Sequence, residues 1–140
     1  MRVTVDTNVR LSGILFGGTP GEILQAASQR VFTLVLSRPI IEELSEVMKR
    51  PKFGLLPEAV DVLVADLESI CEVVRPSVRY DVVAADPDDN VIVECAVAAG
   101  ASLIVSGDEH LLALGSVERI PVLSPAQFAA RMGQGRPEPS

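Results

Sequence analysis

The sequence predicts an α/β domain with a mainly parallel sheet that is covered by helices on both faces. Short apolar runs rich in β-branched residues recur along the chain, and most intervals between them show helical periodicity. This alternation is typical of β/α units. The length of 140 residues and the hydrophobic content of 48% suit one globular domain with a real core. We expect that domain over residues 1–131, followed by a flexible Gly/Pro-rich tail over residues 132–140.

The expected strands are short, apolar and bounded by helix or turn signals. They are "RVTV" at 2–5, "VFTLVL" at 31–36, "CEVV" at 71–74, "SLIVS" at 102–106 and "RIPVLS" at 119–124. In a parallel sheet, functional groups gather beyond the carboxyl ends of the strands. Polar residues that directly follow these segments are therefore the first candidates for a site.

The expected helices have recognisable starts and stops. "TPGE" offers Thr19 as N-cap, Pro20 at the first helical position and Glu22 as partner in a capping box. Other segments begin near a capping residue or proline and end at a proline or glycine. These helices are expected over 37–50, 57–70 and 86–100, with two short ones in "SGDEHLLAL" and "SPAQFAARM".

Composition excludes several classes of protein. No apolar run approaches the roughly 20 residues that span a bilayer, and the first residues lack the pattern of a secretory signal, so we expect a cytoplasmic protein. The net charge of −7 argues against holding nucleic acid by broad phosphate neutralisation. Two interpretations of the acidic excess stay open: an ordinary solvated surface, or several acids gathered in one site that needs cations.

The two cysteines are expected to be buried, reduced thiols. Cys71 lies in a predicted strand and Cys95 in a predicted helix, far apart along the chain. They show no CxxC spacing, and no histidine lies near enough in sequence to complete a zinc site.

Two acids stand out in the first half of the chain. Asp6 ends the first strand, where it belongs either to a binding crevice or to a turn in which it hydrogen-bonds its own backbone. In the helix over 37–50, Glu43 lies roughly 100° from the centre of the apolar stripe, while Glu42 and Glu46 lie roughly 160° away. Glu43 is therefore the nearest of the three to the protein body, unless it extends its carboxylate outward from the boundary.

A further acid begins the helix over 86–100. In "DPDDN", Asp86 is the expected N-cap, and Asp88 and Asp89 lie near the positive end of the helix dipole. Capping explains one acid but does not require three, which repel one another unless a positive charge is close. Asp89 leads the inward face of this helix.

The fourth acid follows a strand. In "SLIVSGDEHLL", Ser106 and Glu109 have the spacing of a capping box. That interpretation leaves Asp108 unexplained at the carboxyl end of a strand, the position that Asp6 also occupies.

In a parallel sheet, Asp6, Glu43, Asp89 and Asp108 can converge on one edge. Closely packed carboxylates cannot all stay ionised without compensation, and hard oxygen ligands suit Mg²⁺ or Mn²⁺. Such a cluster supports displacement at phosphorus, in which the ions activate water and neutralise charge on the phosphate. We therefore expect these four acids to be both metal ligands and catalytic residues.

Four segments together resemble the PIN-domain ribonucleases, most closely the toxin-like branch related to VapC. They are "VTVDTNV", "LSRPIIEELSEVMKRPKF", "DPDDNVIVECAVAAGASLIVSGDEHLL" and "IPVLSPAQF". The resemblance implies a three-layer α/β/α sandwich that binds Mg²⁺ or Mn²⁺ through the same four acids and hydrolyses RNA with metal-activated water. It also implies an antitoxin partner, a homodimer, and Thr7, Asn8 and Ser106 as hydrogen-bonding support around the acids.

The chain departs from that family pattern at two positions. His110 stands where many relatives carry a further acid; it either weakens a second metal position or, as we expect, caps a helix or faces solvent. Arg10 replaces a usually aliphatic residue and is a candidate phosphate contact, although an exposed arginine is the simpler expectation. The basic cluster Lys49, Arg50 and Lys52 is a further candidate RNA contact, but helix C-termini favour such residues anyway.

Two functions from different classes compete. The first is a metal-dependent endoribonuclease that is the toxin of a type II toxin–antitoxin pair; the second is a catalytically silent PIN-like binding or assembly module. Retention of all four acids favours the enzyme. A haloacid-dehalogenase-type phosphatase needs an aspartate where this chain has Asn8, and a receiver domain needs a late strand-end lysine, whereas the lysines here are Lys49 and Lys52.

Overall fold

The computed structural model describes the backbone of residues 1–76 and 87–135, and the side chains in these ranges except those of residues 7, 15, 16, 87–89 and 133–135. The elements are β1 (Arg2–Val5), α1 (Thr7–Phe16), α2 (Gly18–Ser28), β2 (Thr33–Ser37), α3 (Arg38–Met48), the 3₁₀ helix η1 (Pro51–Phe53), α4 (Pro57–Ile70), β3 (Cys71–Val74), α5 (Pro87–Ala99), β4 (Leu103–Val105), α6 (Glu109–Leu114), β5 (Ser116–Val117), β6 (Ile120–Leu123) and α7 (Pro125–Gly135).

The strands form one mainly parallel sheet in the order β3-β2-β1-β4-β6-β5. Every neighbouring pair is parallel except β5 and β6. The chain order reverses at β1, which pairs with β2 on one side and β4 on the other. Ligands of open α/β sheets bind beyond the carboxyl ends of strands at such a switch point. The topology therefore selects the ends of β1 and β4 as the place to look for a site.

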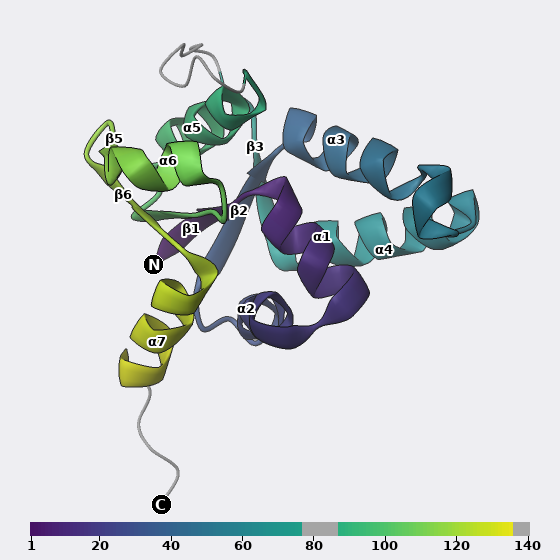
Figure 1. The fold of residues 1–140 in the computed structure, drawn as a ribbon, viewed down its shortest axis with the longest axis horizontal. Coiled ribbons are helices and arrows are strands. Elements are labelled where there is room, and N and C mark those ends of the chain that lie inside the picture. Colours follow the sequence, from purple (N-terminus) through teal and green to yellow (C-terminus); the bar gives the residue numbers. More distant parts are fainter. Residues whose placement is uncertain (77–86, 136–140) are drawn as a thin grey trace, which may run out of the picture.

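Helices cover both faces of the sheet, which confirms the predicted α/β architecture. In Figure 1, α5 and α6 lie on one side of the sheet, and α1 and α2 lie on the other. Thr4 of β1 contacts Cys95 of α5 through atoms 3.8 Å apart, so the alternate residues Val3 and Val5 face the opposite helices. All three are fully buried, as expected for a strand that is covered on both faces.

The five predicted strands are confirmed, and the short β5 was not predicted. β5 and β6 form a hairpin whose turn residues, Glu118 and Arg119, have φ angles of 50° and 67°. Asn-Gly is the usual sequence signal for such a left-handed turn, and Glu-Arg gives no hint of it.

The three long predicted helices are confirmed as α3, α4 and α5, but the start of α2 differs from the prediction. Thr19 does not cap a helix, because α2 begins one residue earlier, at Gly18, and its N-cap Gly17 provides no side-chain hydrogen bond. Gly17 and Gly18 have φ angles of 75° and 65°, a region that glycine enters without strain. The chain reverses there, which packs α2 against α1.

The last helix extends beyond residue 131, the predicted end of the domain. Met132 of α7 is buried, and Phe128 is completely buried with its ring centroid 5.1 Å from that of Phe32. The rings meet edge to face at 82°, a favourable aromatic geometry that holds α7 on the body. The remaining residues of the expected tail, 136–140, lie outside the described residues.

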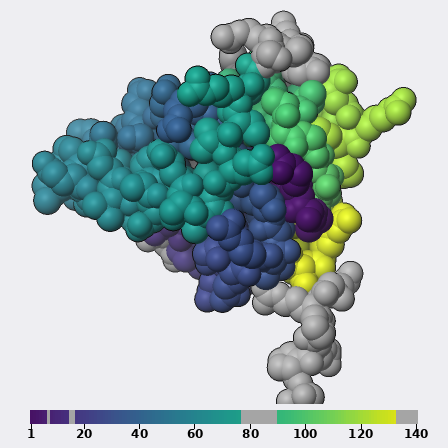
Figure 2. Space-filling model, turned by 180° about the vertical axis from the view of Figure 1, so that it is seen from behind, coloured from purple at the N-terminus to yellow at the C-terminus, as the bar shows by residue number. Residues whose placement is uncertain are grey.

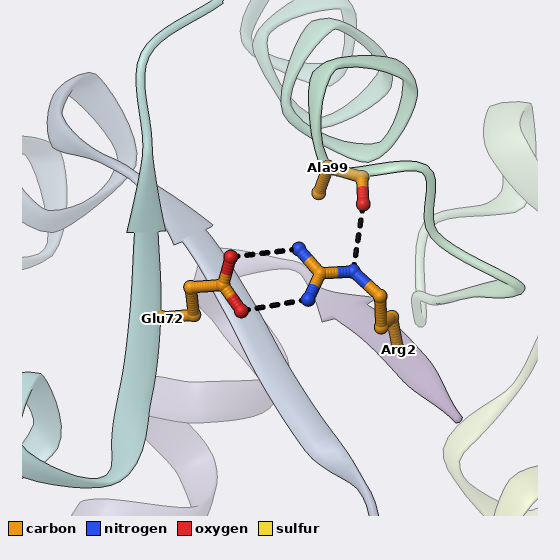
Figure 3. Close-up of polar contacts among 3 residues, drawn as sticks. All are labelled: Arg2, Glu72 and Ala99. Atoms are coloured by element: carbon orange, nitrogen blue, oxygen red, sulfur yellow. Dashed lines mark hydrogen bonds and ion pairs between the residues drawn. The ribbon is translucent and has the colours of Figure 1, made fainter.

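A polar cluster at the amino edge of the sheet orients α5 (Figure 3). Arg2 donates to Glu72 Oε2 at 2.6 Å and Oε1 at 2.9 Å, and its Nε donates to the carbonyl of Ala99 at 2.7 Å. The Arg2 hydrogen bond also lowers the pKa of the Glu72 carboxyl. Since the last residue of α5 lies beside the first residue of β1, the first turn of α5 lies toward the carboxyl edge, about 20 Å away by helix rise.

Both cysteines are free, as predicted, but only Cys95 is buried as expected, whereas Cys71 is half-buried. Burial raises the pKa of the Cys71 thiol to about 11 and also raises the pKa of Cys95, so both thiols are uncharged at neutral pH. Uncharged thiols are poor metal ligands. No helix in the described ranges is long and apolar enough to cross a membrane.

Candidate active site

Asp6 lies where β1 passes into α1, and it is nearly inaccessible, with 5% of its surface exposed. It is the N-cap of α1, because its Oδ1 accepts from the Val9 N–H at 2.9 Å. Its Oδ2 accepts from the Ser106 hydroxyl and from the Gly107 N–H at 3.3 Å. The predicted hydrogen bond to its own local backbone is thus confirmed, and the second oxygen contacts the loop after β4.

Ser106 connects Asp6 with Asp108. The Ser106 side chain is completely buried, and its Oγ donates to Asp6 and accepts from the Asp108 N–H at 3.0 Å. The capping box predicted for Ser106 and Glu109 is wrong: α6 begins at Glu109, and Asp108 is its N-cap. Asp108 Oδ1 accepts from the backbone N–H groups of residues 110 and 111, at 2.8 and 3.3 Å. The ends of β1 and β4 therefore bring the Asp6 carboxylate and the Asp108 backbone N–H to one hydroxyl.

Glu43 approaches this region from α3. It is half-buried, whereas Glu42 and Glu46 are exposed, so the placement predicted from helical periodicity is confirmed. Burial lowers the pKa of Arg10 in α1, and the charges of Asp6 and Glu43 partly oppose this shift. Both acids therefore lie within electrostatic reach of the same guanidinium.

Arg10 does not occupy the exposed position expected for it. It is completely buried, and its Nη1 donates to the carbonyl of Val5. Burial lowers its pKa to about 10, despite the opposing effect of the nearby acids. The reason is its position one turn after Asp6, on the face of α1 that packs inward. A fully buried side chain is not available to an RNA backbone, so we withdraw Arg10 as a candidate RNA contact.

Asp89 lies in the first turn of α5, and only its backbone belongs to the described structure. That turn lies toward the carboxyl edge of the sheet, because the opposite end of α5 contacts Arg2 at the amino edge. Asp86, the expected N-cap, lies outside the described residues, and so does the side chain of Asp88. The backbone thus carries Asp89 toward the edge where Asp6 and Asp108 meet.

A pocket of about 450 Å³ lies between α1, the loop after β4 and the starts of α2 and α7, and Asp108 is one of the acids that line it. Polar and small residues line it: Asn8, Ser12, Gly107, Asp108, His110 and Pro125. His110 is exposed, as expected, and its side chain borders the pocket. Ser12 was missed in the sequence, although its spacing of four residues from Asn8 places both on one face of α1.

Comparison with known proteins identifies the family. The family model of the PIN domain matches residues 2–110. The chain belongs to the PIN-domain family. The resemblance inferred from the four motifs is thereby confirmed, and this is a family of nucleases.

A solved structure shows the same fold for this PIN domain. One chain in the crystal structure of VapBC2 from Rickettsia felis, bound to a DNA fragment from their promoter, matches with a TM-score of 0.66. The match has 16% identity and covers 89% of this chain and 98% of that chain. The predicted three-layer α/β/α sandwich is therefore confirmed. No curated protein matches this chain.

The donor atoms of this PIN domain fit a hard divalent cation. Asp6, Glu43 and Asp108 offer carboxylate oxygens, the ligands that Mg²⁺ and Mn²⁺ prefer. The two cysteines do not compete for the cation, because their thiols are uncharged. Within the ranges whose side chains are described, no three His, Cys, Asp or Glu residues are grouped closely enough to hold a metal ion. A set of three such ligands would therefore have to include a side chain outside those ranges, where the predicted ligand Asp89 lies.

The basic cluster of this PIN domain lies away from the acids. Figures 1 and 2 show α3 and α4 extending from the body as a projection, and residues 49–52 follow α3 near its tip. Lys49 pairs with Asp61 at 3.1 Å, and the Lys52 Nζ lies 5.0 Å from the centre of the Phe53 ring. Both lysines and Arg50 are exposed. Their contact with RNA stays a prediction.

Proposed function

We propose that this PIN domain is a metal-dependent endoribonuclease and the toxin of a type II toxin–antitoxin pair. The observation that supports the proposal is the link from the Asp6 carboxylate through the Ser106 hydroxyl to the Asp108 backbone N–H, at the switch point of the sheet. Capping of α1 and α6 does not by itself require the buried serine to join the Asp6 carboxylate to the loop after β4. The link holds the Asp6 carboxylate against the loop whose residues Gly107 and Asp108 line a pocket.

Asp6, Glu43, Asp89 and Asp108 would hold Mg²⁺ or Mn²⁺. The bound cation would supply activation of water and neutralisation of charge on the phosphodiester. The protein contributes preorganisation: backbone N–H groups fix one oxygen of Asp6 and one of Asp108, while Ser106 joins the Asp6 carboxylate to the Asp108 backbone. Asn8, Ser12 and His110 border the pocket and would donate hydrogen bonds to the RNA backbone.

The structural neighbour VapBC2 suggests the kind of partner. We propose that a small antitoxin inhibits this chain, and that a second copy pairs with it. A groove of about 440 Å³ between α1, α2 and α4 is lined by the apolar residues Ile14, Leu24, Leu63, Leu67 and Ile70, together with Ser28, Asp66 and Ser69. Such a groove would accept the apolar face of an antitoxin helix.

Cleavage of RNA by two matched glutamate variants tests the enzyme. Purified protein is expected to cut a mixed RNA pool with Mn²⁺ and not with EDTA. Glu43→Gln is expected to lower the initial rate by ~100-fold, because it removes a metal ligand. Glu42→Gln changes the adjacent, solvent-exposed residue and is expected to retain the wild-type rate. The measurement is the initial rate of fragment formation on a gel.

Two outcomes would contradict the proposal. Equal rates for the two variants would remove Glu43 from the active site. Absence of cleavage by the wild-type protein with every divalent metal would favour the catalytically silent binding module instead.

Ser106→Ala tests the link between the two strands. Removing the hydroxyl leaves the Asp108 N–H and one oxygen of Asp6 without this partner, which is expected to cost about 1–3 kcal/mol of stability. Cleavage is expected to fall by ~10–100-fold, the usual effect of losing a group that orients metal ligands. Urea unfolding and initial rates measure the two effects separately. Wild-type activity in the variant would reduce Ser106 to a structural residue.

A further inference from the structure

Arg10 has an unusual environment for an arginine. Among the residues with described side chains, Arg10 and Asp6 are the charged residues that are buried. A buried charge is strongly unfavourable unless an opposite charge and hydrogen bonds compensate it. Since Arg10 is completely inaccessible to solvent, its charge acts on other groups within the protein and not on a ligand at the surface.

The surroundings of Arg10 join it to the carboxylate site. It follows Asp6 by one turn of α1, and its Nη1 donates to the carbonyl of Val5, the residue before Asp6. Glu43 lies on α3, which packs against α1, and its charge acts on Arg10 together with that of Asp6. Burial lowers the pKa of Arg10 only to about 10, so the side chain is a cation at neutral pH.

We propose that Arg10 is a positioning residue that serves as an internal counter-ion of the carboxylate site, neutralising Asp6 and Glu43 when no metal is bound and lowering the affinity of the site for divalent cations. The protein supplies a fixed positive charge near these acids, so their negative charge is offset without a metal. The same charge repels an incoming cation. This inference rests on the proposed function in one respect: it assumes that Asp6 and Glu43 are metal ligands.

The first test measures Mn²⁺ binding by titration calorimetry on metal-free protein, without RNA. Arg10→Met removes the charge and keeps much of the side-chain volume, and it is expected to tighten the dissociation constant on the order of tenfold, or about 1.4 kcal/mol. Arg10→Lys keeps the charge and is expected to bind Mn²⁺ within about threefold of wild type. Arg131→Met removes an exposed arginine on α7 and should leave the affinity unchanged.

An unchanged or weaker Mn²⁺ affinity in a folded Arg10→Met variant would overturn the proposal. So would an equal gain in affinity for Arg131→Met, since it would show an effect of net charge alone. The expected pattern is a gain for Arg10→Met that neither Arg10→Lys nor Arg131→Met reproduces.

The second test measures thermal unfolding in EDTA and needs no metal binding. Arg10→Met is expected to lower the melting temperature more than Arg131→Met does, because it leaves Asp6 and Glu43 uncompensated. Adding Glu43→Gln to Arg10→Met is expected to recover part of this loss, whereas Glu43→Gln alone should not stabilise the protein. If Arg10→Met does not fold at all, recovery of folding by the added Glu43→Gln supports the proposal, and continued failure overturns it.

These tests separate the counter-ion from the nuclease. The unfolding experiment reports on Arg10 and Glu43 even if the protein cleaves no RNA. Conversely, if RNA cleavage depends on Glu43 but the unfolding experiment shows no coupling between Arg10 and Glu43, the nuclease proposal is supported and the counter-ion proposal is overturned.

Discussion

Asp6→Asn is expected to lower Mn²⁺-dependent RNA cleavage by at least ~100-fold while the protein stays folded. Asn keeps an oxygen that accepts from the Val9 N–H, so the cap of α1 survives. The other carboxylate oxygen, which accepts from Ser106 and Gly107, is replaced by an NH₂ group that cannot accept a hydrogen bond or bind a cation. The variant should therefore lose most of its cleavage activity while it keeps its folded structure.

The effect of Asp6→Asn on stability tests the electrostatics of the site. Repulsion among acids alone would make this variant more stable without metal. Because Arg10 is buried nearby and Asp6 acts on it, we expect the melting temperature in EDTA to fall instead. Asp61→Asn, an exposed residue paired with Lys49, is the control and should preserve the cleavage rate. Cleavage at the wild-type rate by Asp6→Asn would exclude Asp6 from the active site.

Phe128→Ala is expected to lower the free energy of unfolding by about 3–5 kcal/mol, a large part of the stability of a single domain. The ring is completely buried and packs edge to face on Phe32, so truncation leaves a cavity and removes the aromatic contact. The loss of packing should affect α7 most, because Phe128 lies on this helix, which follows β6 and also contacts α2. Urea unfolding followed by circular dichroism measures it.

Phe53→Ala provides the comparison within the same residue type. Phe53 lies in η1 near the tip of the α3–α4 projection and is only half-buried, so its truncation is expected to cost clearly less. Equal losses for the two variants would show that α7 is not anchored through Phe128. Because Pro125 of α7 borders the pocket, release of α7 is also expected to weaken RNA cleavage.

Local patterns predicted most of the fold. The strand over 2–5 and the helix over 57–70 have the predicted bounds because their sequences carry both the right periodicity and a sharp boundary signal. The same reasoning placed Glu43 closer to the body than Glu42, since helical geometry converts sequence spacing directly into direction. Where boundary signals were ambiguous, at Thr19 and Ser106, the predicted caps were displaced by a residue or more.

Other features depended on contacts between distant segments. The order of strands beside β1 joins the ends of β1 and β4, and only that pairing allows Ser106 to bond to Asp6, 100 positions away. Arg10 shows the same limit most clearly. Its charge favoured an exposed position, yet packing of α1 against α3 buries it next to compensating acids.

The sequence by itself determined the class of fold, the acids at the strand ends and helix starts, and membership of the PIN-domain family, because periodicity and motif order are properties of neighbouring residues. The tertiary structure alone decided which of those residues are in contact and which oxygen of Asp6 accepts from each donor. It also decided that Arg10 is buried. The physical reason is that burial and electrostatic environment are set by residues far apart along the chain, whose distances exist only after the chain has folded.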